Sequence, residues 1–448
     1  MEIDQPEPRA QSQVQVKFVT RDTEISVPTA PILVPSNLKR LGLSQVVNHL
    51  LASSQSIPFD FLVDGAYLRS TIDAYILENG LSSESVLTLE YVRAAVPPKF
   101  LTSFQHDDWV SSVAASTATN KQRAPVVLTG SYDGIARVWN TSGAVLCEAA
   151  GHQAAIKAVK WVDGDSFVTA GMDRALRVWR YTADSTVEAG VKAVAEYVGH
   201  KATVEALAVD AATKRILSAC ADGNVGVWSS VPKESPAAPE VELPARTKKR
   251  RLAQTGPRVA HYGALQMLQG HTAPVSGVAF APQDSSVAYS VSWDHTIKTW
   301  DLTTMVTIDT KTTQHPILSL CAMKSLNILA CGSSARHIIL HDPRESAQGV
   351  SAATLRGHSN AVVGLSANPE NEWQLASAGH DGTVRVWDVR ASSSGNLFTI
   401  NREGEGLSGN EKVFDVEWSS VGIVSGGEDK RVQINATPRG QDVTVNKP

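Results

Sequence analysis

The chain has 448 residues, of which 42% are hydrophobic, and its formal net charge is −4. This length exceeds what one ordinary hydrophobic core holds, so we expect at least two folded units. The weak negative charge argues against a protein that binds nucleic acid over its whole surface, but it allows a local basic patch.

The cysteines and the apolar runs narrow the protein class further. The four cysteines, Cys147, Cys220, Cys321 and Cys331, contain no CxxC pair, which argues against a zinc site or a disulfide framework and fits a reducing compartment. No apolar run approaches the roughly 20 residues of a membrane span. The polar N-terminus resembles neither a signal peptide nor a transit peptide. We therefore expect a soluble intracellular protein with no membrane partner.

Residues 13–95 follow no repeat and predict a small α+β domain behind a disordered tail at residues 1–12. Alternating side chains predict a strand over Val14–Val19, with Glu24–Val27 as its hairpin partner. Helical spacing predicts a helix over Leu43–Leu51, with Ser44 as an early cap. Two further strands are expected over Phe61–Val63 and Ser85–Tyr91. This order is that of the ubiquitin-like β-grasp fold.

From residue 98 onwards, an Asp is followed six residues later by a Trp, again and again. The pairs are Asp133 with Trp139, Asp173 with Trp179, Asp222 with Trp228, Asp294 with Trp300, and Asp381 with Trp387. The shortest spacing between repeats matches the roughly 40–45 residues of WD40 propeller blades. The pattern predicts a mainly β protein with a closed β-propeller.

Two degenerate repeats bring the number to seven. In one, Ala335 replaces the Asp and His341 stands at the Trp position; in the other, Asp429 is kept and Asn435 replaces the Trp. The propeller is expected to span residues 98–440, with a C-terminal tail at 441–448. Lys99–Gln105 is expected to supply the strand that joins the two ends of the ring, which removes exposed strand edges.

A Gly-His pair precedes four of the Asp residues by 21 to 23 positions, counted from the His. The expected pairs are His152 with Asp173, His200 with Asp222, His271 with Asp294, and His358 with Asp381. Buried His and Asp residues at a fixed spacing must satisfy one another, because unpaired polar groups are costly. In WD-repeat proteins such residues form a structural network with a Ser or Thr and with Trp179, Trp228, Trp300 or Trp387. A catalytic role is disfavoured, since catalytic groups do not occur once per blade.

Residues 229–262 interrupt the repeats and are rich in Pro, Ala and Glu, which predicts a flexible insert. The insert contains Lys248, Lys249, Arg250 and Arg251 in succession. Four cations in an extended loop suit a nuclear-import signal. A solvated charge run or a contact with rRNA phosphates are the alternatives.

Short motifs connect the chain with a known family. Pro58–Val63, Gly80–Glu84 and Leu89–Tyr91 resemble the NLE-type ubiquitin-like domain, which precedes the propeller in two ribosome-assembly families. Pro97–Phe100, Asp108–Ser112 and Leu329–His337 resemble the WD-repeat subunits of the PeBoW complex, which include the fungal Ytm proteins and their animal counterparts. The resemblance covers nearly the whole chain except its inserts.

The resemblance implies a non-enzymatic assembly factor without cofactors, located in the nucleus, nucleolus and nucleoplasm. In that family the propeller joins the propeller of the block-of-proliferation protein, and Pescadillo completes the trimer on the large-subunit preribosome. The complex is needed for maturation of the large rRNAs. The AAA ATPase midasin then binds the ubiquitin-like domain and releases the trimer.

Glu84 matches the acidic residue that, in this family, completes the coordination of a metal held by midasin. Mg²⁺ prefers oxygen ligands and is seldom enclosed by one chain, so a carboxylate offered by a partner can complete its coordination. The plainer interpretation is a solvated loop residue, and Glu90 is a weaker candidate for the same role. No metal site is expected within this chain alone.

Three other classes were weighed against this one. A Notchless-type assembly factor has the same N-terminal domain but usually eight blades. An adaptor of a ubiquitin ligase fits the propeller, although the ubiquitin-like domain cannot be conjugated because it continues into the propeller without a terminal Gly-Gly. An enzyme is disfavoured, because the sequence lacks a nucleophile elbow, a P-loop, a Rossmann fingerprint and an HExxH motif, and no small-molecule substrate is expected.

Overall fold

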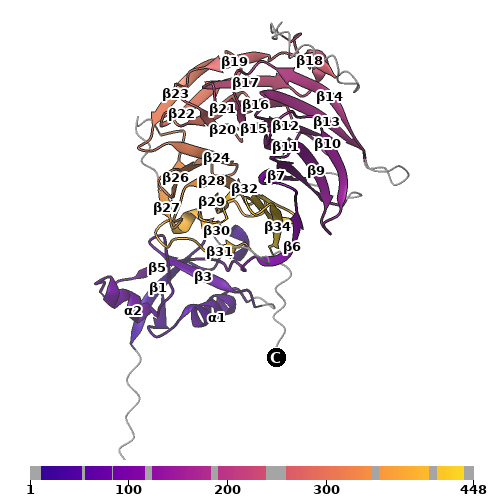
Figure 1. Ribbon diagram of the computed structural model, residues 1–448. Helices are drawn as coiled ribbons and strands as arrows, with labels where there is room; N and C mark the ends of the chain where they lie inside the picture. Colours follow the sequence, from indigo (N-terminus) through magenta and orange to yellow (C-terminus); the bar gives the residue numbers. More distant parts are fainter. Residues whose placement is uncertain are drawn as a thin grey trace, which may run out of the picture. The chain divides into compact units, whose positions relative to one another are not determined.

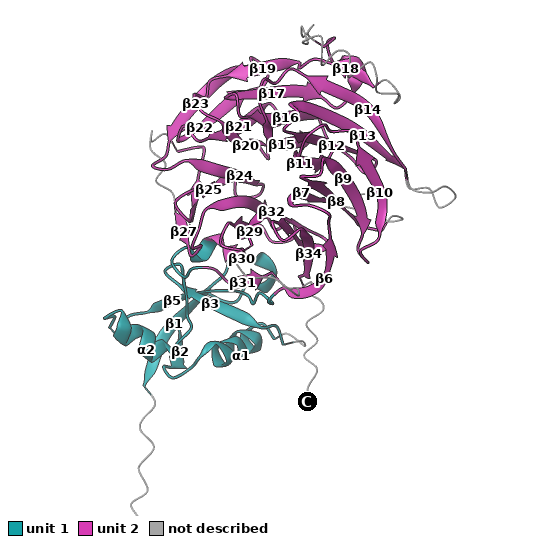
Figure 2. Cartoon of the chain, in the orientation of Figure 1, with its two compact units in different colours: residues 1–97, 390–395 teal, residues 98–389, 396–448 magenta. Residues whose placement is uncertain are grey.

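The computed structural model describes residues 12–52, 56–82, 84–116, 124–182, 190–238, 259–345, 353–402 and 411–437. The chain divides into two compact units, coloured separately in Figure 2. Unit 1 comprises residues 1–97 together with the short segment 390–395. Unit 2 comprises residues 98–389 and 396–448.

Unit 1 is a mixed sheet with two helices. In chain order its elements are β1 (Gln13–Val19), the 3-10 helix η1 (Thr23–Ile25), β2 (Ile32–Pro35), α1 (Arg40–Leu50), β3 (Phe59–Val63), β4 (Ala66–Tyr67), α2 (Ile72–Glu78) and β5 (Leu87–Arg93). The strand order is β2-β1-β5-β3-β4, with β1 and β5 parallel. The predicted β-grasp fold is thereby confirmed, since first and last strands pair at the centre of the sheet.

The predicted hairpin partner of the first strand was wrong. β1 pairs with β2, which begins at Ile32, whereas Glu24 and Ile25 lie in η1. The hydroxyl of Tyr91 donates to the carbonyl of Ile25 at 2.6 Å and accepts from the amide of Val27 at 3.0 Å. Ile25 and Val27 are both buried in the core of unit 1. The alternating burial of Ile25 and Val27 therefore results from their bonds to Tyr91 and not from pairing with a neighbouring strand.

The predicted helix exists, but its start was misplaced. α1 begins at Arg40, and Ser44 lies inside it and not at its cap. The Ser44 hydroxyl instead donates to the Ile57 carbonyl at 3.3 Å and accepts from the Phe59 amide at 3.1 Å. It thus fastens the helix to the start of β3. The short helix α2 was not anticipated; Thr71 caps it by accepting from the Ala74 amide at 3.2 Å.

The described residues of unit 2 form seven sheets, which we call blades 1 to 7 in chain order (Figure 1). Blade 1 holds β7 (Val110–Ala115), β8 (Val126–Ser131), β9 (Ile135–Asn140) and β10 (Val145–Ala150); blade 2 holds β11 (Ile156–Trp161), β12 (Ser166–Gly171), β13 (Ala175–Thr182), β14 (Gly190–Val198) and β18 (Ala260–Tyr262). Blade 3 holds β15 (Val204–Asp210), β16 (Arg215–Cys220), β17 (Asn224–Ser229) and β19 (Gln266–Gln269).

The remaining four blades complete the ring. Blade 4 holds β20 (Val275–Phe280), β21 (Val287–Ser292), β22 (Thr296–Asp301) and β23 (Val306–Thr312); blade 5 holds β24 (Ile317–Met323), β25 (Ile328–Ser333), β26 (His337–His341) and β27 (Thr354–Arg356). Blade 6 holds β28 (Val362–Ala367), β29 (Gln374–Gly379), β30 (Thr383–Asp388) and β31 (Phe398–Asn401); blade 7 holds β32 (Val413–Ser419), β33 (Gly422–Gly427), β34 (Arg431–Ala436) and β6 (Lys99–Gln105). Two short 3-10 helices, η2 (Pro232–Glu234) and η3 (Val389–Ala391), lie in connections.

The ring closes where the sequence predicted. β6 pairs antiparallel with β34, in a register that joins Gln105 to Arg431. The first strands of successive blades pack against one another around the ring, and β32 of blade 7 packs against β7 of blade 1. Buried apolar side chains fill the spaces between neighbouring blades. The predicted seven-bladed propeller is therefore confirmed.

The insert lies within blade 3, between its third strand β17 and its outer strand β19, and it is structured at both ends. η2 follows β17, and β18 adds a fifth, parallel strand to blade 2 by pairing with β14. The prediction of an unfolded insert therefore does not hold for residues 232–234 and 260–262. The edge of blade 2 is covered by the chain itself, which protects the outer strand from pairing with other molecules.

Candidate functional site

Four positions recur in the blades of unit 2. They are a residue in the loop that enters the blade, a Ser or Thr on its second strand, an Asp in the turn after that strand, and a Trp on its third strand. The residue after the Asp position has a left-handed backbone in all seven blades, for example with φ of 65° at Arg174 and 68° at Arg336. This shared turn aligns the four positions even where the sequence departs from the pattern.

Blades 2, 4 and 6 carry the complete network. His152 Nδ1 lies 2.8 Å from Asp173 Oδ2, and His152 Nε2 lies 2.7 Å from Thr169 Oγ1, to which Trp179 Nε1 donates at 2.8 Å. The same contacts join His271, Asp294, Ser290 and Trp300 in blade 4, and His358, Asp381, Ser377 and Trp387 in blade 6. Each polar group is occupied by its neighbours, as a structural role requires.

The acids of these networks are held in their ionised form. Burial alone would raise the pKa of Asp381, but the hydrogen bond and charge of His358 hold it well below its ordinary value. The amide of Ser359 donates to the same carboxylate at 3.0 Å. The Asp therefore connects the loop that enters the blade with the turn between its second and third strands, and fixes both.

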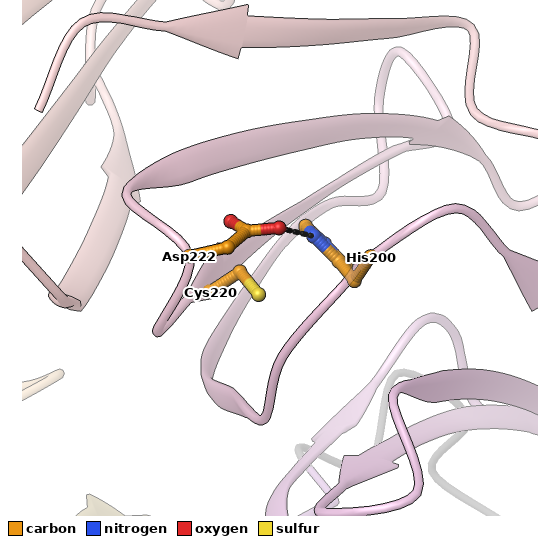
Figure 3. Close-up of side chains that lie close together, drawn as sticks. All are labelled: His200, Cys220 and Asp222. Atoms are coloured by element: carbon orange, nitrogen blue, oxygen red, sulfur yellow. Dashed lines mark ion pairs between the residues drawn. The ribbon is translucent and has the colours of Figure 1, made fainter.

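Blade 3 has the same residues in a looser arrangement (Figure 3). His200 Nε2 lies 2.6 Å from Ser218 Oγ, and Trp228 Nε1 donates to that oxygen at 2.8 Å. The distance from His200 Nδ1 to Asp222 Oδ2, however, is 4.0 Å, too long for a hydrogen bond. The predicted partners are thus near one another without the short contact seen in blades 2, 4 and 6.

An arginine performs the task of the histidine in blade 7. Arg402, directly after β31, donates to both carboxylate oxygens of Asp429, at 2.9 and 2.7 Å, and to Ser425 Oγ at 2.7 Å. The Arg402 side chain is 4% exposed and that of Asp429 1%. We did not anticipate this residue from the sequence. An Asp kept in a repeat without a matching His was the available signal, because a buried carboxylate needs a partner.

In blade 1 the role that one histidine has in blades 2, 4 and 6 falls to two residues. Arg137 bonds the acid, and His106 occupies the position of the histidine. Arg137 donates to Asp133 Oδ2 at 2.6 Å, to Asp107 at 2.9 Å and to Glu148 at 2.9 Å, while Trp139 keeps its bond to Thr129. His106 occupies the loop that enters the blade, and its ring lies against Trp139 with 4.8 Å between the ring centroids and a tilt of 56°. Neither ring nitrogen of His106 has a hydrogen-bond partner in the described part of the chain. Burial lowers the pKa of His106 to about 4, and the charge of Arg137 acts in the same direction.

Blade 5 has replaced the network by apolar packing. Cys331, Ala335 and His341 stand at the Ser, Asp and Trp positions. Cys331 is fully buried within an apolar cluster that also contains Ile317. His341 is buried, and its Nδ1 has no partner among the described residues. Burial also lowers the pKa of His341, so a neutral ring fills space where other blades carry a Trp.

Aromatic side chains gather on the surface formed by the loops and turns of these networks. Trp109 lies 5.5 Å from Tyr132 and 6.0 Å from Phe414, measured between ring centroids, and His380 lies 5.9 Å from Phe414. Lys157 donates to the Tyr132 hydroxyl at 3.0 Å. We call Trp109, Tyr132, His380 and Phe414 the aromatic face. It extends over blades 6, 7 and 1, and Trp109 is 37% exposed.

The inner strands carry a cluster of charged side chains. Lys160 Nζ donates to Glu417 Oε2 at 2.7 Å, and the Ala115 amide donates to Glu417 Oε1 at 3.1 Å. Asp415 Oδ2 accepts from the Ser112 hydroxyl at 2.7 Å and from the Val113 amide at 3.0 Å. These contacts connect blade 7 to blades 1 and 2, so the cluster fastens the closure of the ring.

In unit 1, Glu84 lies in the turn that precedes β5. Its amide donates to Ser82 Oγ at 3.3 Å, and the Ser85 hydroxyl donates to the Ser82 carbonyl at 2.7 Å, which shapes the turn. Glu84 is exposed, and among the described residues its carboxylate has no hydrogen-bond or ion-pair partner. The rival residue Glu90 is instead paired with Arg21 at 2.9 Å.

Exposed apolar side chains surround the Glu84 turn. Leu77 at the end of α2 is 76% exposed, Leu81 is 41% exposed, and Val86 is 45% exposed. A free carboxylate bordered by exposed apolar side chains is a suitable surface for another protein. The sequence predicted the acidic residue but not these neighbours.

Two remaining expectations concern residues or structures outside these sites. The basic residues Lys248, Lys249, Arg250 and Arg251 lie outside the described residues. Among the described helices, none has the length and apolar character needed to cross a membrane.

Comparisons with known proteins match both units. A family model described as the NLE (NUC135) domain matches residues 14–76. A second, described as the WD domain, G-beta repeat, matches residues 98–140, 144–180, 191–229, 263–301 and 349–388. These matches leave out the first three strands of blades 5 and 7, in which the network is replaced or carried by arginine.

Full-length relatives are also known. The chain is 46% identical over 472 residues to the ribosome biogenesis protein ytm1 of Emericella nidulans, an alignment that covers 97% of both chains. It is 46% identical over 458 residues to the corresponding protein of Coccidioides immitis, covering 97% of this chain and 96% of the relative. It is 44% identical to that of Aspergillus niger over 477 residues, with coverage of 97% and 96%. With this similarity along its whole length, the chain belongs to the Ytm1 family of ribosome biogenesis proteins.

Proposed function

We propose that this chain is a non-enzymatic ribosome assembly factor that acts on precursors of the large subunit in the nucleolus and nucleoplasm. The observation that carries the proposal is its full-length similarity to proteins named ribosome biogenesis protein Ytm1, with both units present. The buried His, Asp and Arg side chains of the propeller are engaged in holding its turns, which supports a scaffold and not a catalyst. No cofactor is needed for this role.

The propeller is proposed to scaffold a trimer with Pescadillo and the block-of-proliferation WD-repeat protein. The aromatic face supports such docking, because tryptophan and tyrosine dominate the binding energy of many protein interfaces. Trp109 is partly exposed, and its neighbours Tyr132 and Phe414 keep it in place. A rigid aromatic cluster loses little conformational entropy on binding.

The ubiquitin-like unit is proposed to be the surface that midasin binds, with Glu84 completing the coordination of midasin's metal. The exposed, unpaired carboxylate supports this role, because it needs no rearrangement to reach a cation. A neighbouring carboxylate such as Glu90 would first have to leave Arg21. Exposed apolar side chains around the turn provide area for the remaining contact.

The first test is affinity purification of the tagged chain from growing cells, followed by mass spectrometry and probing for pre-rRNA. Recovery of Pescadillo, the block-of-proliferation protein and large-subunit precursors is expected. Recovery of late particles of the Notchless type would instead assign the chain to the Notchless assembly step. A cullin with no preribosome would instead favour the ligase-adaptor function.

A second test separates the two proposed binding surfaces. Glu84→Ala should weaken midasin binding more than tenfold, which corresponds to about 1.4 kcal/mol, while the trimer forms normally. Glu78→Ala, an exposed acid on the neighbouring helix α2, is the matched control and should bind like the unchanged chain. Trp109→Ala should weaken the trimer and spare midasin binding, with the exposed Trp293 as its control. Unchanged midasin binding by Glu84→Ala would remove Glu84 from the proposal.

The basic run is proposed to direct nuclear import. Replacement of Lys248, Lys249, Arg250 and Arg251 by Ala should leave a fluorescently tagged chain in the cytoplasm. Loss of salt-dependent pre-rRNA binding with normal import would assign the run to an RNA contact instead.

Among the alternatives, the Notchless-type function is disfavoured by the seven sheets in the described residues, since that family usually has eight blades. The ligase-adaptor function has no specific observation in its favour. The enzyme alternative lacks a group of catalytic residues free from structural bonds in the described networks.

A further inference from the structure

Blade 3 contains a combination of side chains that the other blades lack. His200, Cys220 and Asp222 place a ring nitrogen, a sulfur and a carboxylate oxygen within 4.8 Å of one another. Figure 3 shows His200 in the loop that enters the blade, facing Cys220 and Asp222 at the end of β16 and in the following turn. The equivalents of Cys220 in blades 2, 4 and 6 are Gly171, Ser292 and Gly379.

The His200 ring turns its Nδ1 toward this cluster (Figure 3). Its Nδ1 is buried and has no hydrogen bond among the described residues, and the His200 side chain is 0% exposed. In blades 2, 4 and 6 the corresponding nitrogen lies 2.8 to 2.9 Å from its Asp. A buried, unsatisfied nitrogen costs about 1–3 kcal/mol, so its environment calls for a ligand.

We propose that His200, Cys220 and Asp222 form a site for a Zn²⁺-type cation, with water or a backbone carbonyl as the fourth ligand. Nitrogen, sulfur and oxygen donors together suit Zn²⁺, which binds all three in tetrahedral sites. Bonds of about 2.0–2.3 Å place tetrahedral ligands roughly 3.3–3.7 Å apart. The 4.0 Å between His200 and Asp222 is close to this separation.

The hydrogen bonds around the cluster fit this assignment. A ligating histidine usually donates its other ring N–H to a fixed acceptor, which sets the orientation of the ring. Ser218 Oγ lies 2.6 Å from His200 Nε2 and supplies that acceptor, since its second lone pair accepts from Trp228. Lys201, next to His200, is exposed, and the Asp222 side chain is 10% exposed, so the carboxylate side of the cluster lies near the surface.

Blade 4 provides the opposing interpretation and the control. Cys220 Sγ donates to the Ala202 carbonyl at 3.3 Å, and Ser292 Oγ donates to the matching Ala273 carbonyl at 3.1 Å. Cys220 could thus act only as a larger serine that separates His200 from Asp222. The two interpretations differ in one property, namely whether the thiol binds a metal. Cys220→Ser converts blade 3 into a copy of the blade 4 arrangement and should therefore fold.

The experiment is a titration of the full chain with Co²⁺, a spectroscopic substitute for Zn²⁺. The proposal expects one equivalent to produce a cobalt–thiolate charge-transfer band, which Zn²⁺ then removes. Cys220→Ser should lose the band, whereas Cys147→Ser, which changes a half-buried thiol of blade 1, should retain it. Zn²⁺ should raise the midpoint of thermal unfolding by a few degrees in the unchanged chain only, as expected from about a hundredfold excess over Kd.

Two outcomes would overturn the proposal. One is the absence of a charge-transfer band in the unchanged chain while circular dichroism shows it folded. The other is a band of equal strength in folded Cys220→Ser, which would assign the cobalt to another thiol. Because neither readout involves preribosomes, a failure here would leave the proposed assembly function untouched.

Discussion

Blades 6 and 7 are neighbours that hold the same turn with different chemistry. In blade 6, a histidine joins Asp381 to Ser377, and Trp387 completes the network. In blade 7, Arg402 alone reaches both Asp429 and Ser425, and Asn435 replaces the Trp. In both blades a buried donor joins the acid to the second strand, and the histidine and the arginine are two ways to supply it.

The two solutions differ in their charge. A guanidinium is always protonated and offers five donors in a rigid plane, so it pairs with a carboxylate through two parallel bonds. A histidine offers fewer donors and shares the task with a serine and a tryptophan. The bonds that hold the turn thus come from one ion pair in blade 7 and from four residues in blade 6. Blade 7 should therefore be more sensitive to the loss of a single side chain.

The largest expected effect comes from removing that arginine. Arg402→Ala removes the charged partner of the buried Asp429, to which the Arg431 amide still donates at 3.2 Å, and we expect a loss of about 3–5 kcal/mol in the free energy of unfolding. His358→Ala in blade 6 should cost less, about 1–3 kcal/mol, because the amides of Ser359 and Thr383 and the Thr383 hydroxyl still donate to Asp381. Urea unfolding of the two variants measures the difference. Arg344→Ala, which breaks an exposed pair with Asp342, is the control and should cause no measurable change; equal losses in blades 6 and 7 would contradict the comparison.

A second prediction uses blade 1, where the histidine has lost its acid. His106 has a pKa of about 4 in the folded chain, whereas an unfolded histidine titrates near 6.5. The unfolded state therefore binds more protons between these values, and stability falls as the pH is lowered through that window. Between pH 7.5 and 5, His106 should account for about 2 kcal/mol of the loss.

His106→Phe tests this directly, because phenylalanine keeps an aromatic ring beside Trp139 and cannot be protonated. The variant should show a smaller loss of unfolding free energy between pH 7.5 and 5 than the unchanged chain. The exposed His315 offers the control, as His315→Gln should keep the full pH dependence. The idea fails if His106→Phe and the unchanged chain lose stability in parallel. The charged groups that act on His106 are Arg137, Asp133 and Asp107. All three remain in the variant.

The smallest effect concerns the tryptophan that blade 7 lacks. Trp387→Phe removes the indole bond to Ser377, so we expect a loss of about 1 kcal/mol from the bond, with a further contribution from lost packing. Trp293→Phe, at a 52% exposed side chain, should change the unfolding free energy by less than about 0.5 kcal/mol. Thermal unfolding of the two variants is sufficient. A negligible effect of Trp387→Phe would mean that the tryptophan is dispensable in blade 6 as well.

The sequence was most informative where spacing is constant. Each Trp stands six positions after its Asp, because a turn and half a strand fix that distance, so the blades could be counted, including the degenerate ones. The loop that enters a blade varies in length, which is why Arg402 and His106 were missed: each precedes its Asp by 27 residues and not by 21 to 23. The loosened contact of His200 also could not be foreseen, since His200 precedes Asp222 by 22 positions, a spacing within the range of the tight pairs.

Unit 1 shows the same limit at shorter range. The central strands were predicted because buried side chains alternate along them, as Val14, Val16 and Phe18 do. Ile25 and Val27 alternate as well, yet they are held by the hydroxyl of Tyr91, a residue distant in sequence. Helix α2 has seven residues, too few for a clear helical period. For Glu84, sequence indicated an acid in a turn, and the structure added its exposure and its apolar neighbours.

The pairing of β6 with β34 has a consequence for how this chain is made. β6 leaves the ribosome early, but its partner follows only after roughly 330 more residues, which at 5–20 residues per second takes on the order of a minute or less. During that time the strand has an unpaired edge, and blade 7 cannot form. The newly made protein thus depends on protection of one short strand until synthesis is almost complete, which makes the closing blade the natural point for a chaperone to act.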